Sequence, residues 1–281
     1  MNKLHMLLAS VSVLALPQMA SAQTQLSGHG FNETGAFQLT VSGTGEVEVS
    51  PDLRTWSKYA SVTQPTGLED LASRQLDRRF YRAQGGPAVG YVKVVIAPGK
   101  ITVLGNSFGS ALRFDTPESR VALFGVTNPA VKISIYTNGN FVAHTFESAS
   151  GNWQPPLRPI RPQEGFAVQN TGARPITLRM SGPVRQGRLE TTIPAGSSLL
   201  VSPLPNSGPA ALLANAQVPD GTQVLWFDEQ TQKYEACGFD GMEKPGKWEP
   251  KLPDLHPGRA VVVKAPKAIT ITNTFSGSPA R

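Results

Sequence analysis

The sequence predicts a mainly β fold: a small antiparallel β module followed by two tandem repeats, each a β-sandwich or small barrel with one short helix. Charged residues make up only 16% of the 281 residues, against about 25% in an average protein, which disfavours long charged surface helices. The chain also holds 27 glycines and 24 prolines. Its apolar segments are short and regularly spaced between these turn formers, as in sandwiches and small barrels.

Residues 1–22 are predicted to be a signal peptide. Lys3 gives a basic start, an apolar run covers 4–16, and Ala20-Ser21-Ala22 is a small-residue cleavage site. The apolar run is shorter than the roughly 20 residues of a membrane span, and no second such run follows. We therefore expect a bacterial protein that is exported to the periplasm or the exterior without membrane insertion.

Residues 23–86 are predicted to form the first module, a partial immunoglobulin-like sandwich. Alternating apolar and polar residues mark its expected strands, at 37–41, 47–50, 56–62 and 79–83. Gly43, Gly45 and Pro51-Asp52 supply the turns between the strands.

Two segments, 87–186 (repeat 1) and 187–281 (repeat 2), share landmarks at a nearly constant spacing. The extended segment 90–99 matches 187–196 at a spacing of 97 residues. Trp153 matches Trp248, and Ile176-Thr177 matches Ile271-Thr272, at a spacing of 95. A spacing kept over so many landmarks predicts two copies of one structural unit.

Each repeat is expected to contain two strands, a short helix, a hairpin and two final strands. In repeat 1 the helix is predicted from Thr116 as cap, Pro117 at its first position and Gly125 after its end. Asn138-Gly139 then suits the tight turn of a hairpin between 132–136 and 141–146. The matching positions of repeat 2 are Gly208, Pro209 and Asn215 for the helix, and 224–227 with 234–237 for the hairpin.

The first module resembles one that is frequent in uncharacterised exported β-rich proteins of the Planctomycetes–Verrucomicrobia group. Its pattern is E-x-S-x-D-L-x-x-W followed by R-F-Y-R, present here at 48–56 and 79–82. The repeats are similar to a partner region of the same proteins, which ends in P-x-x-G-F-x-V-x-N, here at 162–170. Repeat 2 departs from that motif, with Ala260-Val261 in place of Gly-Phe. The resemblance implies a β-rich exported protein and carries no assigned activity.

The sharpest enzymatic motif is Gly105-Asn106-Ser107-Phe108-Gly109, which matches the G-x-S-x-G of a serine nucleophile elbow. His144 or His256 could act as base, with Asp220, Asp228 or Asp240 behind it. However, the chain lacks the alternating β and α units of an α/β-hydrolase, and the expected helix begins well after Ser107. We therefore expect Ser107 to be a decoy and the protein to be no enzyme.

Binding chemistry is only weakly indicated by the sequence. Trp153 and Trp248 could stack on sugars, but their recurrence at one spacing is more typical of core residues. The sparse histidines and the single Cys237 predict no metal site and no cofactor. The net charge of +6 suits an anionic glycan.

Taken together, the sequence predicts a non-catalytic protein with a structural, adhesion or interaction role at the cell envelope. A glycan-binding module and a serine hydrolase using Ser107 are the alternatives. The expected partners are an envelope or extracellular protein or an anionic glycan, and no nucleic acid is expected because no dense Lys/Arg stripe occurs.

Overall fold

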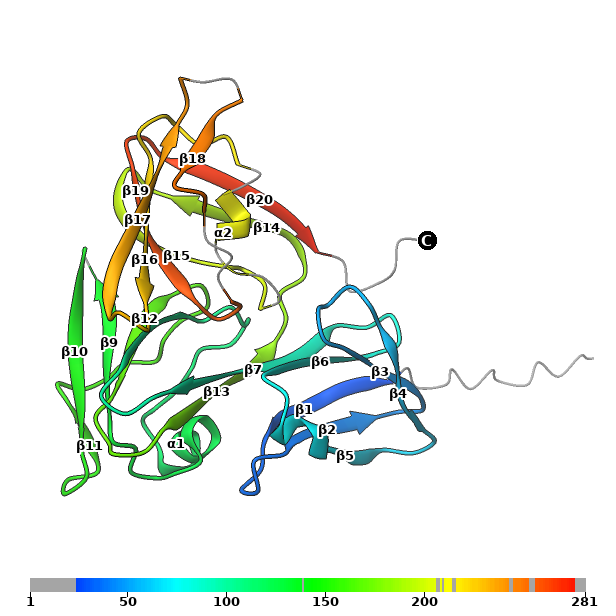
Figure 1. Ribbon diagram of the computed structural model, residues 1–281. Coiled ribbons are helices and arrows are strands. Elements are labelled where there is room, and N and C mark those ends of the chain that lie inside the picture. The colour runs from blue at the N-terminus through cyan, green and yellow to red at the C-terminus, as the bar shows by residue number, and fades with distance from the viewer. Residues whose placement is uncertain are drawn as a thin grey trace, which may run out of the picture.

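The computed structural model describes residues 24–137, 139–205, 208, 210–213, 216–242, 245–252 and 256–275. The predicted signal peptide, Pro209 and Asn215 lie outside the described residues. The molecule has three parts, with the first module, repeat 1 and repeat 2 meeting at the centre of Figure 1.

The first module is a sandwich of two antiparallel sheets. One sheet has the order β1-β2-β5, with β1 at Gln25–Phe31, β2 at Phe37–Ser42 and β5 at Thr66–Asp70. The other has the order β13-β7-β6-β3-β4, with β3 at Gly45–Ser50, β4 at Ser57–Val62, β6 at Arg78–Ala83, β7 at Ala88–Ile96 and β13 at Ile176–Pro183. Phe37 from the first sheet packs with Tyr81 and Tyr91 from the second. A single 3-10 turn, η1 at Leu71–Arg74, follows β5.

Strand β7 contributes to two cores, and its partner β13 contributes to one of them. Tyr91 packs in the first module, whereas Val92, Val94 and Leu178 pack in the core of repeat 1. Alternate residues of one strand point to opposite faces, so β7 places side chains in the core of the first module and in the core of repeat 1. The boundary expected at 86/87 therefore falls within the sheet that the first module and repeat 1 share, between β6 and β7.

Repeat 1 is a sandwich of the β7–β13 ribbon on a five-stranded sheet. The sheet has the order β11-β10-β9-β12-β8, and its strands are β8 at Ile101–Gly105, β9 at Val131–Thr137, β10 at Asn140–Glu147, β11 at Asn152–Gln154 and β12 at Gly165–Asn170. Helix α1, Pro117–Phe124, begins at the Thr116 cap and ends at Gly125 in the left-handed conformation, as its capping residues predict.

Repeat 2 has the same order of elements as repeat 1. A ribbon of β14, Gly187–Ile193, and β20, Ile269–Phe275, packs on a sheet of order β15-β19-β16-β17-β18. Its strands are β15 at Gly196–Val201, β16 at Gln223–Asp228, β17 at Lys233–Asp240, β18 at Lys247–Glu249 and β19 at Ala260–Ala265, and α2 at Ala210–Leu213 lies between β15 and β16. The mainly β fold class is confirmed. Of its two alternatives the structure has sandwiches, because each described sheet is open at both edges.

The β11-β10-β9-β12-β8 sheet of repeat 1 packs against the β15-β19-β16-β17-β18 sheet of repeat 2 through β8 and β12 on one side and β15 and β19 on the other. Val103, Ala167, Val201 and Ala260 form a small apolar cluster between them. Strand β19 is buried on both faces because Val261 and Val263 fill the core of repeat 2 while Ala260 faces repeat 1. The first module, repeat 1 and repeat 2 thus enclose a junction at the start of β19.

Candidate junction site

The segment around Ser107 forms a buried turn at the end of β8. Ser107 is 2% exposed, and its Oγ has no hydrogen-bond partner among the described residues. Asn106 organises the turn: its side-chain oxygen accepts from the Phe108 N–H, and its Nδ2 donates to the Ser110 carbonyl at 2.8 Å. Gly109 N–H donates to the Pro183 carbonyl. The two glycines and the asparagine of the motif therefore have structural roles here.

None of the histidines and aspartates that could complete a Ser107 triad forms a hydrogen bond with Ser107 Oγ in the described part of the chain. Buried His144 is 2.9 Å from the Pro155 carbonyl through Nδ1, and His256 is exposed on the loop before β19. The aspartates accept backbone N–H groups in turns: Asp220 from Gly241, Asp240 from Met242 and Asp228 from Gln230. Helix α1 begins ten positions after Ser107, so no helix N-terminus lies directly behind the serine.

The two recurring tryptophans occupy matching places on short edge strands but differ in burial. Trp153 on β11 is 5% exposed, and its Nε1 donates to the Phe114 carbonyl at 2.9 Å. Trp248 on β18 is partly buried, with its ring centroid 5.1 Å from that of Phe239. Trp153 faces Phe146 across its strand pair, as Trp248 faces Phe239. Trp153 is thus enclosed in the core and offers no platform to a ligand.

The residues of the E-x-S-x-D-L-x-x-W … R-F-Y-R pattern contact one another. The Arg82 guanidinium lies 4.1 Å from the centroid of the Trp56 ring, and its Nε donates to Glu48 at 2.6 Å. Ser50 Oγ accepts the N–H of Leu53, which adopts a φ of 63°. A buried charge is costly unless it is paired, so the stacked and paired Arg82 locks the turn between β3 and β4. These motif residues hold the first module together.

A second buried network lies behind this turn. Both carboxylate oxygens of Asp70 accept from Arg79 Nη1, at 3.0 and 2.9 Å, and Oδ2 also accepts from the Tyr81 hydroxyl. Burial, followed by the hydrogen bond to Asp70, raises the pKa of Tyr81 far above its ordinary value. The Tyr81 hydroxyl therefore stays protonated and donates to the carboxylate at every physiological pH.

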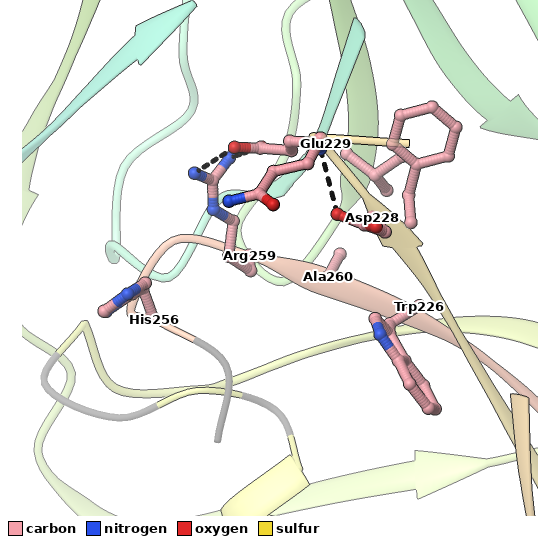
Figure 2. A pocket seen from close by; sticks show the side chains of 9 residues that line it. Trp226, Asp228, Glu229, His256, Arg259 and Ala260 are labelled. Carbon is pink, nitrogen blue, oxygen red and sulfur yellow. Dashed lines mark hydrogen bonds and ion pairs between the residues drawn. The ribbon is translucent and has the colours of Figure 1, made fainter. Parts of the chain in front are cut away.

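The junction cavity is an opening of about 290 Å³ between repeat 1 and repeat 2. It is lined by Val103, Trp226, Phe227, Asp228, Glu229, Gln230, His256, Arg259 and Ala260. Figure 2 shows Arg259 against Glu229, with His256 to one side and Trp226 below Ala260. The site thus combines apolar and aromatic side chains with several polar groups that can orient a ligand.

The β16–β17 hairpin supplies about half of the residues that line the junction cavity. Three hydrogen bonds hold it against repeat 1. Ile101 N–H donates to the side-chain oxygen of Gln232 at 2.8 Å, and Gln232 Nε2 donates back to the Ile101 carbonyl at 3.2 Å. Lys100 Nζ donates to the Gln230 carbonyl. Behind the cavity, Leu104 bridges to Arg259 in antiparallel fashion. These contacts make the cavity wall a fixed part of the fold.

Charge in the cavity is partly compensated. The Arg259 guanidinium forms a two-bond ion pair with Glu229, of which the Nη2–Oε2 bond is 2.9 Å. Burial lowers the pKa of Arg259, and the neighbouring Glu229 partly offsets this effect. Hydrogen bonds from the Thr231 side chain and the Gln230 N–H lower the pKa of Asp228. The Arg259–Glu229 pair is therefore compensated internally, and Asp228, held by Thr231 and the Gln230 N–H, adds one further carboxylate to the lining.

A neighbouring hollow of about 370 Å³ shares His256 and Arg259 with the junction cavity. Its other lining residues come from the first module and β7 (Asp77, Arg78, 92–95) and the loop before β19 (Pro257). Lys93 lies in this wall with its Nζ donating to the Ser73 carbonyl at 2.8 Å, and burial lowers its pKa. The two hollows are adjacent, since His256 and Arg259 line both of them, and together they are called the junction groove.

The sequence reasoning missed most of this site. Of its lining residues, the sequence motifs point only to His256 and Asp228, as candidate partners of Ser107. One usable signal existed: Arg259 directly precedes a strand of four apolar residues, at the position where repeat 1 has Glu164. Its place at the start of an apolar strand indicates that the surroundings of Arg259 are fixed by the fold. Only the structure shows that Arg259 faces repeat 1.

Two classes of site are absent from the part of the chain that the structure describes. No three His, Cys, Asp or Glu side chains there gather as a metal ion would require. None of the helices seen in those residues has the length and apolar character to span a membrane. Comparison with protein-family models, curated proteins and solved structures finds no match for this chain.

Proposed function

We propose that the chain is an exported, non-catalytic protein of the bacterial cell envelope that acts by binding. The junction groove carries this proposal, because it lies where three structural units meet and is lined by groups that recognise polar ligands. Two of its charged residues, Arg259 and Glu229, already form an ion pair with each other. A general base or a nucleophile must itself be free to react with a substrate. A binding site needs only donors and acceptors that are held in place.

The absence of catalysis is supported by the surroundings of Ser107. Its Oγ is enclosed, without a hydrogen-bonded histidine, and the turn that holds it is organised by Asn106. A nucleophilic serine needs a base within about 2.6–3.2 Å and a route for the substrate. A fluorophosphonate probe should leave the protein unlabelled. Labelling that disappears in Ser107→Ala would make the protein a serine hydrolase instead.

A glycan is the ligand class that the junction cavity favours. Trp226 is partly buried against the core of repeat 2, and the rest of its ring lines the cavity, where it can contact the C–H side of a sugar. Asp228, Gln230 and His256 supply donors and acceptors for hydroxyl groups. We therefore place the stacking of a sugar on an indole in the junction cavity, and not at Trp153 or Trp248. Trp153 is enclosed, and Trp248 packs on Phe239 at the far edge of its sheet.

The test is a titration of the full chain with soluble envelope polysaccharides and neutral oligosaccharides, followed by calorimetry and tryptophan emission. We expect Trp226→Ala to weaken binding at least about tenfold, because a stacked indole is a typical hot spot. Trp248→Phe is the matched control, since Trp248 lies on the same sheet but outside the cavity. Undetectable binding, or equal binding by both variants, would contradict the glycan proposal.

Export is tested separately from binding. The chain is expressed in a bacterial host, and the N-terminal sequence of the protein outside the cytoplasm is determined. We expect it to begin at Gln23, after the predicted cleavage site. Retention of all of the protein in the cytoplasm with Met1 intact would contradict the envelope assignment.

A further inference from the structure

The packing of the two repeats is reciprocal. The hairpin β16–β17 of repeat 2 lies against the start of β8 in repeat 1, through Gln232 and Ile101. The hairpin β9–β10 of repeat 1 lies near the start of β15 in repeat 2, through a 3.2 Å contact between the Tyr136 hydroxyl and Ser197 Oγ. Each repeat therefore extends its hairpin over the first sheet strand of the other.

A cavity lies at the second of these contacts, as it does at the first. This hairpin cavity has a volume of about 280 Å³ and is lined by Tyr136, Gly139, Gln163, Glu164, Gly165, Ser197, Ser198 and Leu199. Its parts match those of the junction cavity: Tyr136 precedes the hairpin turn as Phe227 does, and Glu164-Gly165 opens β12 as Arg259-Ala260 opens β19. The same architecture thus forms two cavities, one on each hairpin.

The hairpin cavity differs from the junction cavity in its chemistry. Glu164 is the one carboxylate in its wall, and Arg158 neutralises it through two hydrogen bonds, one of them 2.7 Å long. The Arg161 N–H adds a third bond to Glu164 at 2.9 Å. The remaining polar groups are uncharged, namely the Ser197 and Ser198 hydroxyls, the Gln163 amide and the Tyr136 hydroxyl. An uncharged ligand with many hydroxyl groups suits such a wall better than an ion does.

The aromatic and amide groups of this wall are held in place. The Tyr136 ring packs edge-on against Phe141, with ring centroids 5.1 Å apart. Gln163 Nε2 donates to Thr191 Oγ1 at 3.0 Å, which leaves its side-chain oxygen for other donors. Leu199 fills the space above Gly165, where any Cβ would overlap its side chain. The cavity is therefore formed before a ligand arrives, which lowers the entropy cost of binding.

We propose that the hairpin cavity is a second saccharide-binding site, specific for neutral sugars. The inference rests on the proposed glycan binding at the junction cavity. The two sites together make the chain bivalent, so that one polysaccharide strand or two separate strands can be held by both repeats. Bivalent binding raises the affinity for a polymer over that for a short oligosaccharide without any new contact.

The test is calorimetry of the full chain with chitohexaose and cellohexaose, combined with hydrogen exchange of the backbone. We expect two sites per chain and slower exchange in 196–199 in addition to 226–230. Ser197→Ala and Tyr136→Phe remove single hydroxyl groups and should fold normally. Each should weaken one of the two sites about three- to tenfold, since a hydrogen bond contributes roughly that factor. Trp226→Ala should weaken the other site and leave protection at 196–199 unchanged.

The outcomes separate the two proposals. One site per chain that is lost in Trp226→Ala and unaffected by Tyr136→Phe would overturn the hairpin site and leave the junction site standing. One site that responds only to Tyr136→Phe and Ser197→Ala would support the hairpin site and overturn the junction site. No binding of either sugar at millimolar concentration would overturn both.

Discussion

The carboxamide of Gln232 closes the free edge of β8 by bonding to both backbone groups of Ile101. The Ile101 N–H donates to the amide oxygen at 2.8 Å, and the amide nitrogen donates to the Ile101 carbonyl at 3.2 Å. Two residues 131 positions apart thereby reproduce the pattern of a β-ladder. Because an unpaired strand edge is a site of aggregation, one side chain protects repeat 1 and fixes repeat 2 upon it.

Gln232→Ala should destabilise the contact between the repeats. It leaves the N–H and the carbonyl of Ile101 without their partner, and each lost bond costs about 0.5–1.5 kcal/mol. We therefore expect a loss of about 1–3 kcal/mol in the free energy of unfolding, measured by urea denaturation. Gln230→Ala is the control, because Lys100 bonds to the Gln230 backbone carbonyl and not to its side chain. Equal stability of the two variants would show that the Gln232 amide contributes nothing.

Gly165→Ala should weaken the packing between the sheet of repeat 1 that holds β12 and the sheet of repeat 2 that holds β15. A Cβ at this position overlaps the Leu199 side chain, and overpacking of a closed interface typically costs about 1–3 kcal/mol. Leu199→Ala alone should also destabilise, because it removes apolar contacts. The double variant should be more stable than the sum of the two losses predicts, since the smaller side chain makes room for the new methyl group. Strictly additive losses in urea denaturation would argue against the contact.

Much of the fold could be predicted from local patterns. Helix α1 follows from Thr116, Pro117 and Gly125, and the hairpin β9–β10 from Asn138-Gly139 between two alternating segments. These signals act over a few residues, so the sequence alone carries them. Strand β1 was missed because its segment holds two glycines and few apolar residues. Strands β11 and β18, three residues each, are too short to show any period.

The site was harder to predict, because it arises between segments that are far apart in the chain. The ladder position of Leu104 opposite Arg259, and the Gln232–Ile101 bonds, depend on how the repeats pack. No local pattern carries that packing. Conversely, the G-x-S-x-G motif at Ser107 matched a catalytic pattern because glycine and asparagine serve any tight turn, whatever its function.

Trp153→Ala should cost far more stability than Trp248→Ala. Trp153 is enclosed between Phe114 and Phe146 and gives its Nε1 proton to the Phe114 carbonyl. Its removal opens a cavity and leaves that carbonyl unpaired, at a cost of about 3–5 kcal/mol. Trp248 is only partly buried, so about 1–2 kcal/mol is expected for it. Thermal and urea unfolding of both variants measure the difference, and a larger loss for Trp248→Ala would refute the assignment of Trp153 to the core.

Glu164 should make the stability of the protein depend on pH in the acidic range. Burial of this carboxyl tends to raise its pKa, but the Arg158 hydrogen bonds and the Arg161 N–H outweigh burial, so the net shift is downward. A pKa that is lower in the folded state means that the unfolded chain binds a proton more readily. The stabilisation is therefore fully present above the ordinary pKa of a glutamate, about 4.3, and is lost as the pH falls through the lower pKa of the folded state.

Glu164→Gln removes this pH dependence because the amide cannot ionise. We expect the variant to be less stable than the parent at pH 7 and the gap between them to close as the pH falls below about 4. Urea denaturation at pH 7, 5 and 3 measures the gap. Glu249→Gln is the matched control, because Glu249 forms an exposed ion pair with Lys247 and such pairs contribute about 0–1 kcal/mol. A stability gap for Glu164→Gln that stays constant from pH 7 to 3 would show that its ionisation does not stabilise the fold.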